Sequence, residues 1–102
     1  MAFLRIEYKT KKLERVCTNA QEAEKQHGKK MAEKIHQRID EILAALNVEM
    51  MVQYRIGRCP PLKGNRRNQY AMHLIEPYRI VFEKKGNEIQ IVKIMEIVDY
   101  HN

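Results

Sequence analysis

"YRIVFEKKGNEIQIVKIMEIVDYH" occupies residues 78–101 of this 102-residue chain and decides how its second half folds. Segments 78–85 and 89–98 are rich in β-branched residues, and "GNE" at 86–88 is a tight-turn sequence between them. Such a pattern predicts a β-hairpin. The second strand is apolar at both sets of alternating positions, so we expect it to be a central strand.

The segments before the hairpin predict a short first strand, then helices, and then one more strand. "FLRIEY" at 3–8 and "YAMHLI" at 70–75 are typical of strands, and "EP" at 76–77 indicates a turn. Helices are expected at 9–17, 18–28 and 29–47, whereas 48–69 is expected to be mostly loop. The third helix carries an apolar stripe at helical spacing: Met31, Ile35, Ile39, Ile42, Leu43 and Leu46. The sequence therefore predicts one α+β domain over 1–102, with helices packed on an antiparallel sheet.

Composition narrows the class of protein. No apolar run is long enough to span a bilayer, and the first residues lack the apolar core of a signal peptide, so we expect a cytoplasmic protein. Cys17 and Cys59 fit no metal or redox spacing and are too few for a disulfide scaffold. We expect idle thiols, no metal and no cofactor.

One segment of the chain has a high net positive charge because it contains cations and no acidic residues. The net charge is +6, and residues 50–75 contain no Asp or Glu. This segment holds five cations, which we name the basic block: Arg55, Arg58, Lys63, Arg66 and Arg67. A basic segment without acids is a candidate phosphate-binding surface. A solvated basic face without function is the simpler interpretation.

The last strand runs directly into Asp99, Tyr100 and His101. If no bulge intervenes, alternation places Asp99 and His101 on the face of Ile91, Met95 and Ile97, and Tyr100 on the other face. An antiparallel sheet would bring this end close to Arg79 and to the "LKGNRR" segment at 62–67. Cations, a carboxylate, an imidazole and a phenol would then converge.

Such a set of groups can cleave RNA without a metal. A base takes the proton from the 2′-hydroxyl, an acid protonates the leaving 5′-oxygen, and cations stabilise charge on the phosphoryl oxygens. Histidine suits proton transfer because it titrates near neutral pH. On these residues alone, a structural role for the final triplet and a non-enzymatic nucleic-acid-binding module both remain open.

The same motifs resemble the HigB-like toxins of the RelE superfamily, the killer proteins of bacterial type II toxin–antitoxin systems. The resemblance is carried by "KKLERVC", "GKKMAEKIHQRIDEI", "PPLKGNRRNQYAMHL", "YRIVFE" and "EIVDYH". It implies a RelE-like fold with N-terminal helices packed on a curved antiparallel sheet. It also implies an endoribonuclease that cleaves mRNA on the translating ribosome and inhibits translation. The implied partner is a HigA-like helix-turn-helix antitoxin, and operator DNA would be bound only through that complex.

The resemblance also assigns residues. The catalytic positions that it implies are Asp99, Tyr100, His101, Lys63 and Arg79. Arg66 or Arg67 matches a further basic position, and we expect RNA or phosphate contacts from Arg55, Arg58, Arg66, Arg67 and His73. Many members carry a histidine where this chain has Pro60, and His73 on the next strand could compensate. An inactive subunit that binds the antitoxin and tunes operator repression is the alternative function.

Overall fold

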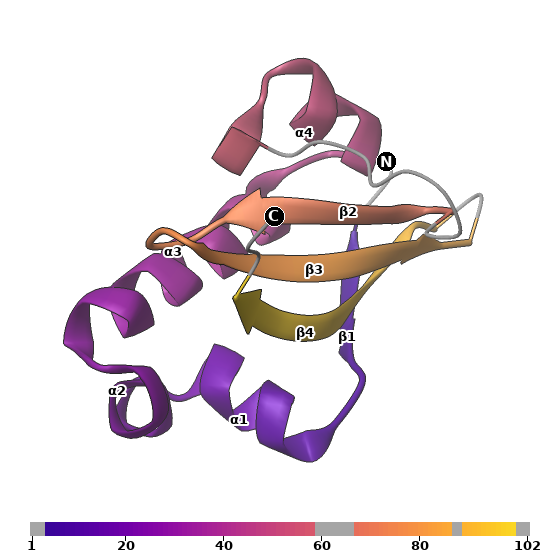
Figure 1. The fold of residues 1–102 in the computed structure, drawn as a ribbon. Coiled ribbons are helices and arrows are strands. Elements are labelled where there is room, and N and C mark those ends of the chain that lie inside the picture. The colour runs from indigo at the N-terminus through magenta and orange to yellow at the C-terminus, as the bar shows by residue number, and fades with distance from the viewer. Residues whose placement is uncertain (1–3, 59–66, 87–88, 100–102) are drawn as a thin grey trace.

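The computed structural model describes residues 4–58, 67–86 and 89–99, and its strands form one four-stranded sheet in the order β1-β4-β3-β2 (Figure 1). β2 (Gln69–His73), β3 (Tyr78–Lys85) and β4 (Ile91–Asp99) are antiparallel neighbours, and β1 (Arg5–Tyr8) pairs in parallel with β4. The predicted α+β architecture, the hairpin and the central position of the last strand are confirmed. The parallel β1–β4 pair was not predicted.

The three helices that the sequence predicts are present: α1 (Lys11–Thr18), α2 (Ala20–His27) and α3 (Lys29–Ala44). The side chains of Thr10 and Asn19 begin α1 and α2, because each accepts a 3.1 Å hydrogen bond from the backbone N–H three residues further on. None of the described helices is both long enough and apolar enough to cross a membrane.

The core lies between the helices and one face of the sheet, and α3 passes behind β2 and β3 in Figure 1. Along the predicted stripe, Met31, Ile35, Ile39 and Ile42 are buried. Full burial of such a side chain contributes about 1.5–3 kcal/mol. The prediction is wrong for the last two members, which are 61% and 57% exposed: Leu43 and Leu46. Position 43 lies about 100° further round the helix than position 42, and position 46 lies beyond the helix end.

The predicted loop after α3 begins as a helix. α4 (Val48–Gln53) is followed by η1 (Ile56–Arg58), a short 3₁₀ turn. The Asn47 side chain accepts a 2.7 Å hydrogen bond from the backbone N–H of Met50 and so caps α4. The fully buried Val48 anchors α4 in the core. An Asn cap followed by apolar residues was therefore a helix signal that the scattered cations obscured.

A β-bulge interrupts the hairpin. Val81 lies opposite Glu96, but Phe82 lies opposite Ile94, so β4 contains one extra residue, Met95. An extra residue bends the strand and reverses the alternation of its side chains beyond that point. The bend of β4 is visible in Figure 1.

The bulge changes which face the end of β4 presents. Ile97 packs against the helix-side core, and Asp99 lies opposite Tyr78, which also packs on that core. Val98 lies opposite Arg79 on the other face. The predicted assignment of faces is therefore correct up to position 94 and wrong for Ile97, Val98 and Asp99, because it assumed a regular strand. Tyr100 and His101 lie outside the described residues.

The connection between β3 and β4 starts at Gly86, where φ is +78°. A Cβ at this position would lie 2.5 Å from the carbonyl oxygen of Ile89, so only glycine fits. The rest of the predicted turn, residues 87–88, lies outside the described residues.

Candidate active site

The sheet has a second face, directed away from the core cluster, which we name the outer face. Its members on β2, β3 and β4 follow from strand alternation and register: Gln69, Ala71, His73, Arg79, Val81, Glu83, Lys85, Ile91, Lys93, Glu96 and Val98. Ala71 and Val81 are buried but do not belong to the helix-side core cluster. The outer face therefore has a small apolar centre with polar and charged side chains around it.

Three side chains meet at one end of the outer face, and we name them the end cluster: His73, Glu76 and Arg79. His73 and Arg79 lie directly opposite each other on β2 and β3, which places their Cβ atoms about 4.5–5.5 Å apart. Glu76 is in the turn between the strands. Its Oε1 lies 3.0 Å from His73 Nδ1, and its Oε2 accepts a 3.2 Å hydrogen bond from Arg79 Nη2. The carboxylate thus bridges the imidazole and the guanidinium.

The charge on Glu76 determines which nitrogen of the His73 imidazole carries the proton. The hydrogen bond from His73, and then that from Arg79, lower the pKa of Glu76 below its ordinary value. An ionised carboxylate only accepts hydrogen bonds, so Nδ1 of His73 must carry the proton. In the neutral ring, Nε2 then holds the free electron pair.

Further contacts hold the end cluster in place. Arg38 on α3 donates from Nε to the carbonyl oxygen of His73 at 2.7 Å and from Nη1 to Glu41 at 2.8 Å. Arg79 Nη1 donates to the carbonyl oxygen of Tyr78 at 2.9 Å. A site supported by ordered strands and by such contacts is better positioned than one on a loop.

Two of the predicted catalytic residues, Asp99 and Arg79, lie within the described part of the chain. Asp99 and Arg79 lie at the same end of the hairpin but on different faces, since Asp99 is opposite Tyr78. Four predicted residues lie outside the described part of the chain: Lys63, Arg66, Tyr100 and His101.

The described cations of the basic block are all exposed: Arg55, Arg58 and Arg67. Arg55 comes immediately before the η1 turn and Arg58 is its last residue, and both adopt positive φ. This turn is next to β2, because a Cβ added at Gly57 would lie 2.9 Å from the side chain of Met72. These cations are therefore available to solvent beside the strand that carries His73.

Two carboxylates near the predicted site were not identified from the sequence. Glu76 was interpreted only as part of a turn, although a hairpin joining the strands of His73 and Arg79 places a turn residue between them. Glu96 is on the outer face opposite Val81, diagonal to Arg79. The bulge put it there, and the sequence pattern gave no sign of the bulge.

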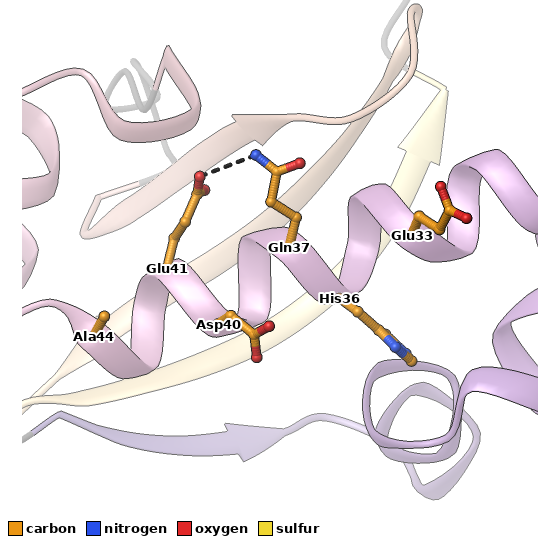
Figure 2. Close-up of a pocket in the computed structure, with 6 residues that line it drawn as sticks. All are labelled: Glu33, His36, Gln37, Asp40, Glu41 and Ala44. Atoms are coloured by element: carbon orange, nitrogen blue, oxygen red, sulfur yellow. Dashed lines mark hydrogen bonds between the residues drawn. The ribbon is translucent and has the colours of Figure 1, made fainter.

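The outer side of α3 contains a hollow of about 560 Å³ (Figure 2). Its lining residues are Glu33, His36, Gln37, Asp40, Glu41 and Ala44. His36 Nε2 lies 3.0 Å from the carbonyl oxygen of Val16, and Gln37 donates to Glu41 at 3.2 Å. Three carboxylates around one hollow repel phosphate, so this hollow is a poor candidate for an RNA site.

The described thiol is also a poor candidate for chemistry. Cys17 is buried, and burial raises the pKa of its thiol to about 12. The reactive form of cysteine is the thiolate, which is then nearly absent at neutral pH. This agrees with the predicted idle role of Cys17, while Cys59 lies outside the described residues.

Comparison with known proteins identifies the fold. No protein-family model and no curated protein matches this sequence. Among solved structures, the chain is similar to the YoeB/ParE toxin from Agrobacterium tumefaciens, with a TM-score of 0.66. The match covers 95% of this chain and 99% of that chain at 15% sequence identity. The chain therefore has the α+β fold of a YoeB/ParE toxin.

Proposed function

We propose that this protein is the toxin of a type II toxin–antitoxin system and a HigB-like, ribosome-dependent mRNA endoribonuclease. The observation that carries the proposal is the end cluster, where a histidine and an arginine lie side by side on paired strands. The hairpin that holds Arg79 leads directly into the C-terminal Asp99-Tyr100-His101 motif. The resemblance of the sequence motifs to HigB-like toxins and the similarity of the fold to a YoeB/ParE toxin support the same proposal.

The proposed reaction is an intramolecular transfer within RNA. A base removes the 2′-hydroxyl proton, O2′ attacks the adjacent phosphorus, and the bond from phosphorus to O5′ breaks as an acid protonates O5′. The products are a 2′,3′-cyclic phosphate and a free 5′-hydroxyl. His101 acts in proton transfer, with Asp99 orienting it or serving as the base, and Tyr100 contributes a catalytic or base-stacking contact. Lys63 and Arg79 bind the scissile phosphate, with Arg66 or Arg67 beside them.

The proposed partners follow from charge and resemblance. The basic block contacts phosphates of rRNA or mRNA, because it combines five cations with no acid. A HigA-like antitoxin with an acidic surface neutralises this +6 chain, and opposite charge speeds their association. Operator DNA is contacted only through that complex. The proposed compartment is the cytoplasm, where ribosomes are available.

Growth and cleavage together test the proposal. Expressed alone, the protein should arrest growth, and the neighbouring antitoxin gene should restore it. Purified protein should cut mRNA on programmed ribosomes and leave a 5′-hydroxyl downstream. A subunit that only binds nucleic acid or antitoxin would leave both growth and mRNA intact, and that result would reject the proposal.

A further inference from the structure

We propose that His73 is a proton-transfer residue of the ribonuclease site and that Glu76 is the positioning residue that fixes its tautomer. This inference rests on the proposed ribonuclease function. It gives His73 a role beyond phosphate contact and assigns the base to His73 instead of Asp99. It also supplies an imidazole to a chain that has Pro60 where many HigB-like toxins carry a histidine.

The geometry of the imidazole supports this role. Nδ1 donates to Glu76 Oε1 at 3.0 Å, so Nε2 of the neutral ring is left as the base. No hydrogen-bond partner for Nε2 is found within residues 4–58, 67–86 and 89–99, and 22% of the His73 side chain is exposed. A reacting 2′-hydroxyl can therefore approach this nitrogen from solvent.

Arg79 is placed to bind the phosphate beside the proposed base. It lies directly opposite His73, and two of its N–H groups are used by Glu76 and by the carbonyl oxygen of Tyr78. The guanidinium has further N–H groups that can bind phosphate. A phosphate held by Arg79 would place the neighbouring 2′-hydroxyl near Nε2 of His73, where the base must be within hydrogen-bond reach.

Glu76 should have opposite effects on binding and on chemistry. Its negative charge lies 3.2 Å from Arg79, so it opposes the approach of a phosphate. The same carboxylate keeps the proton on Nδ1 of His73 and the electron pair on Nε2. Replacing Glu76 by Gln should therefore leave RNA affinity unchanged or raise it, while it slows cleavage. A residue that only stabilises the turn would not separate the two quantities in this way.

The test uses single-turnover cleavage of a defined mRNA on programmed ribosomes, together with ribosome affinity and ¹⁵N NMR of the His73 ring. His73→Gln should lower the cleavage rate by about 10²–10⁴-fold, as for loss of a general base. Glu76→Gln should lower it by about 10–100-fold, the range seen when the partner that orients a metal-binding histidine is removed. Glu83→Gln is the matched control, since Glu83 lies on the same face and contacts Gln69 instead.

The NMR spectrum gives a readout that does not depend on activity. The wild-type ring should show Nδ1 protonated and Nε2 unprotonated, and Glu76→Gln should produce a mixture of tautomers. If wild-type protein cleaves and folded His73→Gln cleaves equally fast, the role of His73 is rejected while the proposed function stands. An Nε2-protonated wild-type ring would reject the role of Glu76. If wild-type protein does not cleave at all, the proposed function and this inference fail together.

Discussion

The outer side of α3 and the end of the sheet both hold a histidine among carboxylates, but only one of them suits RNA. On α3, a ring nitrogen of His36 contacts a main-chain carbonyl oxygen, and the described residues that line the hollow include no Lys or Arg. At the sheet end, His73 is oriented by Glu76 and faces Arg79. A cation beside an imidazole that a carboxylate orients is therefore a better indicator of the candidate site than the size of a hollow.

The largest difference between the two regions should appear in catalysis. His101→Ala should lower mRNA cleavage by about 10²–10⁴-fold and remove growth arrest, because it deletes the proposed proton-transfer group. Asp40→Asn, in the α3 hollow, should leave both unchanged. Cleavage rates and antitoxin binding would be measured together, so that loss of folding is detected. A folded His101→Ala protein with the wild-type cleavage rate would remove the C-terminal motif from the mechanism.

Substitutions on the buried and exposed sides of α3 should differ in their effect on the free energy of unfolding. Ile42→Ala should lower the free energy of unfolding by about 2–5 kcal/mol, because Ile42 is fully buried and its loss leaves a cavity. Leu43→Ala should change it by less than about 0.5 kcal/mol, because Leu43 is 61% exposed. Urea unfolding of both variants measures these values. Equal losses would mean that Leu43 is covered in solution, as the sequence pattern predicted.

Ribosome binding should respond to charge at the basic block. Reversing Arg66 and Arg67 to Glu should weaken ribosome binding. The slope of the logarithm of the binding constant against the logarithm of the salt concentration should become shallower by about 1 for each lost phosphate contact. Glu33→Gln on α3 is the matched control for a charge change away from that surface. A salt titration with both variants decides the matter. An unchanged slope for the Arg66 and Arg67 variant would exclude this segment from the interface.

The smallest effect should be on the pH dependence of stability, through a carboxylate that lies away from both the α3 hollow and the end cluster. Hydrogen bonds from Lys84 and then Gln90 lower the pKa of Glu49, which links α4 to the sheet. A pKa lowered on folding stabilises the protein above the unfolded value and loses that contribution as pH falls through the folded value. Glu49→Gln should therefore reduce the loss of stability between pH 7 and acid pH. Urea unfolding across that range would show no such reduction if the contact does not form in solution.

Much of the fold was predictable because local patterns and tertiary packing agree. The hairpin and the four buried positions of the α3 stripe follow from spacing and residue type. α4 was missed because scattered cations and glycines outweighed the cap at Asn47. The parallel pairing of β1 was missed because pairing partners distant in sequence leave no local signal.

The candidate site was less predictable than the fold. Arg79 and His73 were predicted to be functional residues, but the bridging position of Glu76 depends on a register that only the folded hairpin defines. The bulge at Met95 moved Asp99 to the helix side, and a strand pattern that is apolar on both faces gives no indication of such a shift. Sequence reasoning therefore named two members of the end cluster, but neither Glu76 nor the arrangement of the three side chains.

The most direct test of the central claim is to map mRNA 5′ ends in cells after brief induction of the wild-type protein and of Arg79→Ala. We expect new 5′-hydroxyl ends within translated coding regions for the wild-type protein. For the variant we expect a loss of about 10²–10³-fold, the range for removal of a transition-state donor. New ends should disappear when translation initiation is blocked, because the ribosome presents the substrate. Growth arrest by the wild-type protein without new 5′ ends would contradict the assignment as an mRNA endoribonuclease.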